Sequence, residues 1–544
     1  MKLFIRKIIT IGNNVKISQL SLLVSFIIFT CGFLVTRLAF LYYYNIHNFS
    51  VDYLSYFTIV DQLDRGMLPN LSIRTPGYPL FLKLVFTFVS KNSAVVVVQN
   101  SITFAVSLFF IYVIYKKYKS LCLFAAIALI AFVSSSVHLK HDTTLLAESL
   151  YVNAMLLFFA LLILAIRYNS ILLWILCSVD MAYAILLRPV GIILIIHYLL
   201  ILIFLFRNSY KKRILWAFGI PFISILLLLL LYNYFTVKSF ALTCYSENFL
   251  LPATATYLEP SPDYDAKVNG IITVSRDLVK KKDKEIINKS WDLFKLHFLF
   301  SQYYEKSRIK TYRLLASYED KDSFGIYMKW RPLLRKISLA AIRKHPSLAL
   351  KFTLSNSVAY FNNITTDAIL RKFIEREDAT PRKTPRIFVA YDQYMKFYLT
   401  KEDSLSLSKD FLKKLLKENN DLAPIPELHT DNLHENYGHE YGKSYFKKLY
   451  SIFSAIHASL FRNIIWAIFF FAALIFSFVK LLRTRGRHKG SFILFAITSA
   501  AFFNAILVCS IELPYLRYSY THEFAFYFSL FLFPIALMPD HDFE

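Results

Sequence analysis

The chain has 544 residues, of which 56% are hydrophobic and 18% are charged. Soluble domains carry about 25% charged residues, so this composition excludes an ordinary water-soluble protein. The formal net charge of +25 would suit a nucleic-acid binder, but many Lys and Arg residues fall in short breaks between apolar runs. The charge therefore indicates membrane topology, and we expect no nucleic acid partner.

About ten apolar runs are long enough to cross roughly 30 Å of hydrocarbon. They cover residues 21–44, 94–115, 121–137, 145–166, 171–187, 190–206, 214–235, 463–482, 491–509 and 520–538. The first run is longer than the apolar part of a signal peptide and lacks a small-residue cleavage site, so we read it as a retained helix. The sequence predicts an all-α integral membrane protein, a polytopic bundle of about ten transmembrane helices.

Positive residues concentrate in alternate breaks, as expected for cytoplasmic loops. These breaks carry Lys2, Arg6, Lys7 and Lys16; Lys116, Lys117 and Lys119; Arg207, Lys211, Lys212 and Arg213; and Arg483, Arg485, Arg487 and Lys489. The remaining breaks then face the other side of the membrane, where we expect the polar functional residues.

The break at 236–462 has charged, Tyr-rich and amphipathic stretches but no spanning run. It is expected to form a mainly helical extracytoplasmic insert that partly rests on the membrane, with a helix through 347–360 and a loop at 419–442. The chain thus divides into an N-terminal transmembrane module (1–235), this insert (236–462) and C-terminal transmembrane helices (463–544).

The first outward break contains an acidic residue close to the membrane boundary, Asp52. Such a carboxylate can act as a general base toward a hydroxyl or hold a divalent cation against a phosphate. A solvated loop aspartate is an equally weighted interpretation.

The segment R-T-P-G-Y-P-L-F-L starts at Arg74 and feeds an apolar stretch too short to span. Two prolines around Gly77 restrict the backbone, so we expect a turn leading into a juxtamembrane helix. Arg74 could bind phosphate through its planar guanidinium or serve a structural role at headgroup level.

The second outward break has the densest group of ionisable residues beside apolar sequence. It contains Lys140, His141 and Asp142, and Glu148 follows at the start of the next apolar run. A boundary carboxylate is costly unless it faces a partner or a cavity, which favours a functional role for Glu148. Lys140 and His141 could instead be interfacial anchors.

Arginines also mark two later outward turns. Arg188 lies at the turn before the sixth run, and Arg517 lies with Glu512 and Tyr518 in the last outward break. A lipid-linked phosphate entering from the bilayer needs cations at this depth, and Arg offers bidentate contact. Asp180, inside the fifth run, is expected to pair internally as a structural residue.

The order of these motifs resembles the GT-C membrane glycosyltransferases, most closely the family 39 type. That group includes protein O-mannosyltransferases and the aminoarabinose transferases of lipid A. The resemblance rests on the acidic first loop, the R-T-P-G-Y-P-L-F-L segment, L-A-E-S-L at 146–150, L-L-R-P at 186–189 and the R-Y pair at 517–518. Protein O-mannosyltransferases have an Asp-Glu pair in the first loop, whereas Tyr53 follows Asp52 here, so the acceptor type cannot be transferred from them.

The resemblance implies transfer of a sugar from a polyprenyl-phosphate donor to an acceptor hydroxyl outside the cytoplasm. Asp52 corresponds to the catalytic acid of the first loop, and we expect Asp142 and Glu148 to act with it. The cations expected near the donor phosphate are Arg74, Lys140, Arg188 and Arg517. The expected substrate contacts are Tyr53, Tyr78, His141 and Tyr518.

Cofactor and location follow from the same comparison. Asp52 with Asp142 or Glu148 could hold a divalent cation, Mg²⁺ or Mn²⁺, but the same residues can also work without a metal. The expected partners are the lipid-linked sugar, membrane lipids and a lipid, glycan or protein acceptor. The resemblance also implies a bacterial inner membrane, with the site facing the periplasm.

Two other functions share some of these features. A transporter or flippase for lipid-linked glycans would also need a polar cavity, but the sequence has no internal repeat and no matching pair of broken helices. A glycan polymerase or ligase of the envelope would have a similar cavity without the early Arg-Thr-Pro-Gly-Tyr-Pro turn. No Gly-rich nucleotide-binding loop is visible.

Overall fold

The described part of the protein consists of helices joined by short turns. The computed structural model describes residues 15–43, 51–71, 74–89, 91–208, 210–243, 247–318, 330–365, 464–511 and 522–537. Every regular element in these ranges is an α-helix or a short 3₁₀ helix. The all-helical prediction is therefore confirmed for this part of the chain.

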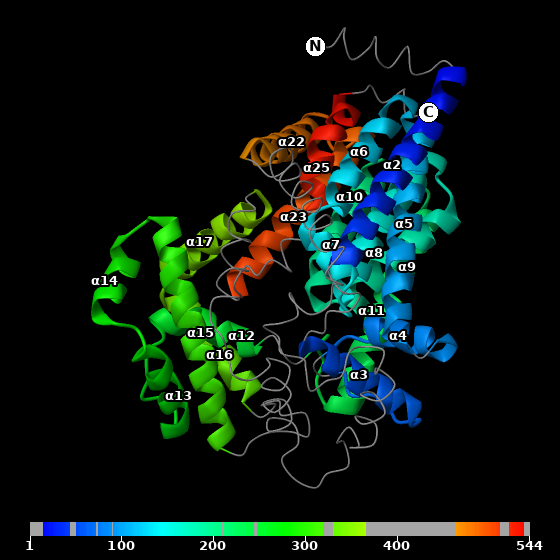
Figure 1. The fold of residues 1–544 in the computed structure, drawn as a ribbon. Helices are drawn as coiled ribbons and strands as arrows, with labels where there is room; N and C mark the ends of the chain where they lie inside the picture. The colour runs from blue at the N-terminus through cyan, green and yellow to red at the C-terminus, as the bar shows by residue number, and fades with distance from the viewer. Residues whose placement is uncertain are drawn as a thin grey trace.

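The N-terminal half supplies most of a bundle of apolar helices (Figure 1). Its elements are α2 (Val15–Tyr43), α3 (Val51–Asp64), α4 (Gly77–Phe88), α5 (Asn92–Lys117), η1 (Lys119–Leu121), α6 (Cys122–Val133), α7 (Ser136–Asp142), α8 (Ala147–Tyr168), α9 (Ile171–Leu187), η2 (Pro189–Ile193), α10 (Leu194–Arg207) and α11 (Lys212–Val237). Helix α8 lies at the centre, packed between α5 and α9, and is buried along nearly its whole length.

The C-terminal elements complete the same bundle. They are α22 (Ile464–Arg483), α23 (Lys489–Ile511), α25 (Phe524–Phe531) and η5 (Phe533–Leu537). Helix α25 packs against α6, and α23 packs against α8 and the η2 turn. One continuous apolar core therefore joins segments that are more than 300 residues apart in the chain.

Seven helices in the described residues are long and apolar enough to cross a membrane. They are Gln19–Leu38, Asn92–Lys117, Ala147–Tyr168, Pro189–Arg207, Lys212–Val237, Trp466–Arg483 and Lys489–Ile511. A membrane bundle is thus supported, while three of the ten expected spans (121–137, 171–187 and 520–538) are not among these seven helices.

Local backbone chemistry explains the three shorter segments. The run at 121–137 stops at Val133 because the Ser135 hydroxyl accepts a hydrogen bond from the His138 amide and starts a new helix, α7. The run at 171–187 forms the 17-residue α9, which ends before the Arg188-Pro189 turn. In the last run, α25 has only eight residues and passes into a 3₁₀ turn that contains Pro534.

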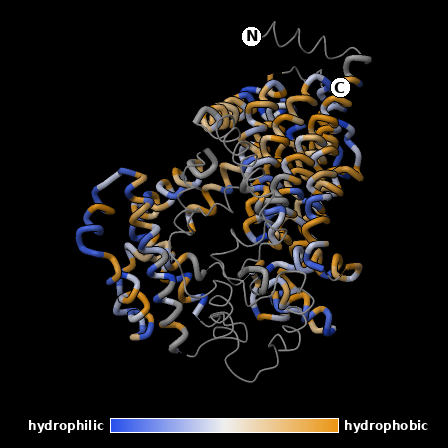
Figure 2. The backbone as a smooth tube through the Cα atoms, in the orientation of Figure 1, coloured by the Kyte–Doolittle hydropathy of each residue, from blue (hydrophilic) through white to orange (hydrophobic). Residues whose placement is uncertain are grey.

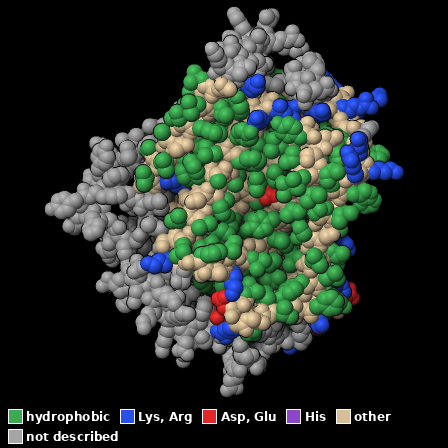
Figure 3. All heavy atoms as spheres, turned by 90° about the vertical axis from the view of Figure 1, so that its right-hand side faces the viewer, with side chains coloured by type: hydrophobic (Ala, Val, Ile, Leu, Met, Phe, Trp, Pro, Cys, Tyr) green, Lys and Arg blue, Asp and Glu red, His purple; other side chains and the backbone are tan. Residues whose placement is uncertain are grey.

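The surface of the bundle suits contact with lipid. In Figure 3 hydrophobic side chains cover most of the described face, with Lys and Arg along its upper margin and further charged side chains at its lower edge. Large apolar side chains point outward from several helices, among them Leu23 on α2, Ile203 on α10 and Leu228 on α11, each more than half exposed. Such a continuous apolar surface is unfavourable in water.

Two of the basic breaks meet at one end of the bundle. The Arg207 guanidinium donates to the Arg485 carbonyl over 3.1 Å, and the Asn208 amide donates to the Gly486 carbonyl over 3.2 Å. At the opposite end, the Tyr232 hydroxyl of α11 donates to the Pro69 carbonyl in the first outward break over 2.7 Å. These two basic breaks and the first outward break thus lie at opposite ends of the bundle. This agrees with the prediction that successive breaks alternate between the two sides of the membrane.

Residues 247–318 and 330–365 form a second body beside the bundle, here called the lateral unit (Figure 1). Its elements are α12 (Glu247–Thr254), η3 (Ala255–Tyr257), α13 (Ala266–Arg276), α14 (Lys281–Lys289), α15 (Leu293–Ser317), α16 (Arg331–Lys344) and α17 (Pro346–Thr365). Figure 2 shows that hydrophilic residues are more frequent along the lateral unit than along the bundle. The helix expected through 347–360 is part of α17, whereas the loop expected at 419–442 lies outside the described residues.

Helix α17 connects the lateral unit to the bundle. It packs against α15 on one side and α23 on the other. The Asn504 amide of α23 donates to the Tyr360 hydroxyl over 2.7 Å, and the Asn356 amide donates to the Cys509 carbonyl over 3.4 Å. These buried polar contacts fix the place where the lateral unit meets the membrane helices.

Candidate active site

The first outward break and the Arg74 turn are bound to each other. Arg74 Nε donates to the Ser55 hydroxyl of α3 over 2.8 Å, and its guanidinium carbon lies 5.0 Å from the centre of the Tyr56 ring. Asp52 occupies the first turn of α3, one turn before Ser55. The side chains of Asp52 and Tyr53 lie outside the described residues, and only their backbone positions in α3, before Ser55, are given.

Tyr78 continues this connection into the bundle. Its buried ring meets Tyr56 edge-on with 4.8 Å between centroids, and its hydroxyl donates to Gln99 Oε1 of α5 over 2.9 Å. The Gln99 amide in turn donates to the carbonyls of Asp142 and Thr144, over 3.4 and 3.3 Å. The sequence predicts that Tyr78 contacts a substrate, but its hydroxyl already has a protein partner.

Gly77 explains how the Arg74 turn reaches the Arg188 turn. A Cβ atom built on Gly77 would lie 2.6 Å from the Leu186 carbonyl oxygen, at the end of α9. Only glycine fits at this distance from the backbone. The two turns that the sequence predicts to be functional are therefore in direct contact, because Leu186 lies only two residues before Arg188.

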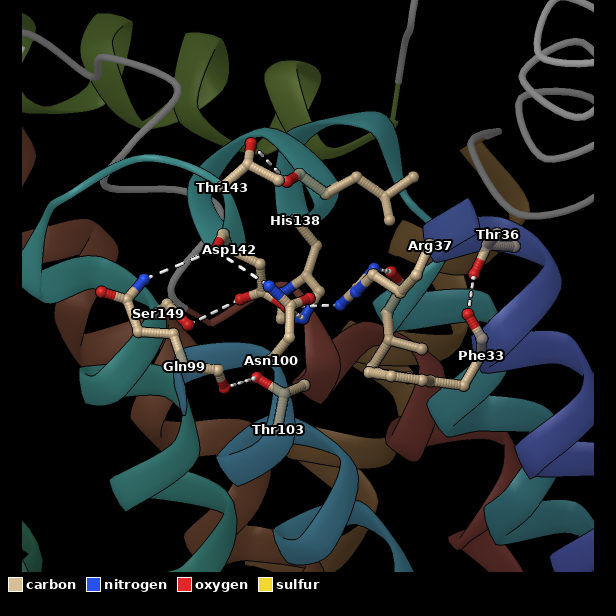
Figure 4. Close-up of polar contacts among 12 residues, drawn as sticks. Phe33, Thr36, Arg37, Gln99, Asn100, Thr103, His138, Asp142, Thr143 and Ser149 are labelled. Atoms are coloured by element: carbon tan, nitrogen blue, oxygen red, sulfur yellow. Dashed lines mark hydrogen bonds and ion pairs between the residues drawn. The ribbon is translucent and has the colours of Figure 1, made fainter. Parts of the chain in front are cut away.

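Asp142 is the centre of a buried ionic cluster (Figure 4). It forms an ion pair with Arg37 of α2, and its other oxygen accepts from the Ser149 hydroxyl over 2.6 Å. His138 Nε2 lies 3.2 Å from the oxygen that pairs with Arg37. Arg37 also donates to the Val133 carbonyl over 2.8 Å. Both oxygens of the carboxylate are therefore engaged within the protein.

These contacts keep Asp142 ionised although it is fully buried. Burial opposes the charge, but the neighbouring His138 and Arg37, with hydrogen bonds from His138 and Ser149, outweigh it and lower the pKa of the Asp142 carboxyl to about 2. A carboxylate with such a low pKa is a weak base at neutral pH. Its contacts favour a positioning role over the catalytic role that the sequence predicts.

Glu148 and Arg188 form a second buried pair next to the first. Arg188 Nη2 lies 3.3 Å from Glu148 Oε1, and the guanidinium is 6.0 Å from the centre of the Tyr151 ring. Among the described residues, Glu148 Oε2 has no hydrogen-bond partner. Glu148 directly precedes Ser149, so the first turn of α8 contributes one residue to the Glu148–Arg188 pair and one hydrogen bond to Asp142. The site residues predicted in these two breaks thus come together.

The other predicted site residues are less well placed. His141 is buried in the last turn of the short helix α7. The side chain of Lys140 lies outside the described residues, as do Arg517, Tyr518 and Glu512. Asp180 is nearly buried in α9, and no contact within the described part of the chain confirms the expected internal pairing.

The predicted site residues did not include Arg37, Gln99, His138 or Ser149, although each of them belongs to the network. Arg37 and Gln99 lie inside apolar runs, and His138 opens the second outward break. A charged residue within a spanning helix is itself a signal of a buried partner, so Arg37 could have been singled out from the sequence. Its partner could not, because Asp142 is 105 residues away.

No group of three or more His, Cys, Asp or Glu side chains with metal-binding geometry occurs among the described residues. Asp142 is surrounded by cationic and donor groups, which fit a bound cation poorly. Since the side chain of Asp52 is not included, the divalent cation stays a prediction.

The chain was compared with family models, with curated proteins and with solved structures, and nothing matches. The functional argument therefore depends on the residues and their geometry.

Proposed function

We propose that this protein is a membrane glycosyltransferase that transfers a sugar from a polyprenyl-phosphate donor to an acceptor hydroxyl on the extracytoplasmic side. The observation that carries the proposal is the contact between separate outward turns. Arg74 and Tyr78, the Asp142 cluster, and the Glu148–Arg188 pair are connected by hydrogen bonds or backbone contact. Carboxylates and arginines from distant parts of the sequence are gathered at the end of the bundle opposite two of the basic breaks.

In the proposed reaction Asp52 is the general base. The oxygen of the acceptor hydroxyl attacks the anomeric carbon of the sugar while its proton passes to the Asp52 carboxylate. The bond between that carbon and the phosphate oxygen breaks, and polyprenyl phosphate leaves with the electron pair. An in-line displacement of this kind inverts the anomeric centre.

Arg74 and Arg188 are proposed to stabilise the departing phosphate, together with Lys140 and Arg517. Arg74 is held by Ser55 and Tyr56, so its guanidinium is oriented before the donor binds. Arg188 pairs with Glu148, and its guanidinium is proposed to bind the phosphate when the donor is present. Glu148 Oε2, which has no hydrogen-bond partner among the described residues, is proposed to accept a hydrogen bond from a hydroxyl of the sugar or the acceptor.

The buried Asp142 cluster is proposed to hold this arrangement together. Arg37 of the first spanning helix, His138 of α7 and Ser149 of α8 all converge on one carboxylate. The cluster fixes the start of α8 and therefore the position of Glu148. Tyr78 and Gln99 extend the same support to the Arg74 turn.

The proposed partners are a polyprenyl-phosphate sugar, membrane lipids and a lipid, glycan or protein acceptor, with Mg²⁺ or Mn²⁺ as an optional cofactor. A bacterial inner membrane with the site toward the periplasm is part of the proposal. Labelling of a cysteine introduced at position 52 with a membrane-impermeant reagent tests the sidedness.

The test of the reaction is sugar transfer by the purified full-length protein in nanodiscs with defined polyprenyl-phosphate sugars. Asp52→Asn should lower the rate at least about 100-fold, the usual contribution of a general base. Asp64→Asn is the matched control, because Asp64 lies on the same helix but pairs with Lys83 at the surface. Full transfer by Asp52→Asn would remove the proposed base. Transbilayer movement of the lipid-linked sugar without transfer by the wild type would favour a flippase.

A further inference from the structure

The lateral unit exposes a row of large aromatic side chains where α15 begins. Trp291, Phe294 and Phe298 are 58%, 64% and 66% exposed. Trp291 lies two residues before α15 (Leu293–Ser317), and Phe294 and Phe298, four residues apart, share one face of the helix. The opposite face of α15 carries Leu296, Phe300 and Tyr303, which form the core against Phe352 of α17. The exposed row is therefore additional to the apolar residues needed for folding.

Contacts with α17 hold this row in a fixed position. The buried Lys351 ammonium donates to the carbonyls of Ile287 and Asn288 at the end of α14, and it lies 4.8 Å from the centre of the Trp291 ring. Leu350 and Leu354, on either side of Lys351 in the sequence, are 50% and 38% exposed. Together Trp291, Phe294, Phe298, Leu350 and Leu354 form what we call the apolar patch.

Positive charge borders the apolar patch. Residues 280–295 contain six lysines against three acidic residues. All three acids already have partners: Asp283 accepts from the Tyr303 hydroxyl, Glu285 pairs with Lys289, and Asp292 accepts from the backbone amide of Lys295. The exposed lysines nearest to the patch in the sequence are Lys281, Lys282, Lys284, Lys289 and Lys295. Aromatic side chains next to lysines are typical of a surface that lies in the headgroup layer of a membrane.

The apolar patch is also at a suitable height, relative to the membrane helices, for contact with a bilayer. In Figure 1, α14 and the start of α15 lie at the level of α17 and the lower part of α23, with α14 on the side of the lateral unit away from the bundle. Helix α23 is one of the seven candidate spans, and α17 packs directly against it. The patch thus lies to the side of the membrane helices, where a bilayer around them would continue.

We propose that the apolar patch inserts into the headgroup region of the surrounding bilayer, with the neighbouring lysines bound to anionic phospholipids. The chemistry requires a leaflet with negative surface charge, since each lysine gains from the potential of such a surface and the aromatic rings favour its interface. The lateral unit is then attached to the membrane at two places, through α17 at the bundle and through this patch. The inference concerns membrane attachment and does not depend on the proposed reaction.

The test uses the full-length protein with its native cysteines replaced, in nanodiscs of bromine-labelled phosphatidylcholine with or without phosphatidylglycerol. Phe298→Cys carries an environment-sensitive fluorophore, and Lys336→Cys, an exposed site on α16, is the matched control. Bromolipid should reduce the fluorescence of the label at position 298 about twofold or more and leave that at 336 unchanged. The quenching should weaken without phosphatidylglycerol and in the Lys281→Glu/Lys282→Glu/Lys284→Glu variant.

Three results would overturn the proposal. Equal quenching at both positions means that the patch has no special relation to the bilayer. Absence of quenching at 298 in every lipid, with the protein monodisperse in size-exclusion chromatography, means that the patch lies in water or against protein. Quenching that does not respond to phosphatidylglycerol or to the triple substitution removes the role of anionic lipid.

Discussion

The bundle and the lateral unit use charged residues in opposite ways. In the bundle the Arg37–Asp142 pair has side chains that are 5% and 0% exposed, and both partners make further hydrogen bonds. In the lateral unit the Lys289–Glu285 pair has side chains that are 78% and 64% exposed and lies along a single helix. Since water screens the second pair and not the first, only the buried pair can determine how helices are arranged. Similar chemistry therefore positions a site in one region and contributes mainly solubility in the other.

The largest expected effect comes from breaking the buried pair. Arg37→Ala leaves the Asp142 carboxylate without its guanidinium partner, and losses of this kind cost about 3–5 kcal/mol. The thermal midpoint of the purified protein in detergent should fall markedly, and sugar transfer should fall with it. Lys289→Ala is the matched control from the lateral unit and should change the stability by less than about 0.5 kcal/mol. Equal midpoints for the two variants would contradict the comparison.

Acidification is expected to have a smaller effect on the stability of the folded protein. The pKa of Asp142 is about 2 in the folded protein, against an ordinary value of 3.8. Because the folded value is the lower one, its stabilising contribution is complete above about pH 4 and is lost as the pH falls toward about 2, on the order of 2 kcal/mol.

The midpoint of Asp142→Asn, measured over the same pH range, should lack this component. The variant is expected to start less stable at neutral pH and to lose less stability on acidification than the wild type. Parallel curves for the two proteins would show that other groups account for the acid sensitivity.

The smallest of these effects should come from Lys351→Met in the lateral unit. The substitution keeps the apolar stem but removes the hydrogen bonds to the end of α14, at a cost of about 1–2 kcal/mol. Amide hydrogen exchange should become faster in α14 and in the residues around Trp291, and remain unchanged in α8. Faster exchange throughout the bundle would mean that the two regions unfold together.

Much of the membrane architecture could be predicted from apolar runs and basic breaks. Seven of the ten expected spans correspond to long apolar helices, and two of the basic breaks meet at one end. The run at 121–137 was overestimated, because Ser135 caps a new helix within sequence that is still largely apolar. Hydropathy reports solvent preference over a window and is insensitive to a single capping residue.

The candidate site was predicted in part. Arg74, Asp142, Glu148 and Arg188 were identified as members of three outward turns, and the structure connects all three. The sequence did not show which of these residues has which role. Asp142 has both oxygens occupied while Glu148 has one without a partner in the described residues, and this difference depends on Arg37 and Ser149, which reach Asp142 from other helices.

The sequence by itself determined that this chain needs a bilayer, where its helices run, and which turns share a side. Each of these depends on local composition, because transfer of a helix into hydrocarbon is a sum over its own residues. Only the tertiary structure decided that Arg37 pairs with Asp142, that Gly77 contacts Leu186 and that Trp291 lies under Lys351. Such pairings depend on how helices far apart in the chain pack, and the cost of an unpaired buried charge or a misplaced backbone atom arises only when the whole bundle has formed.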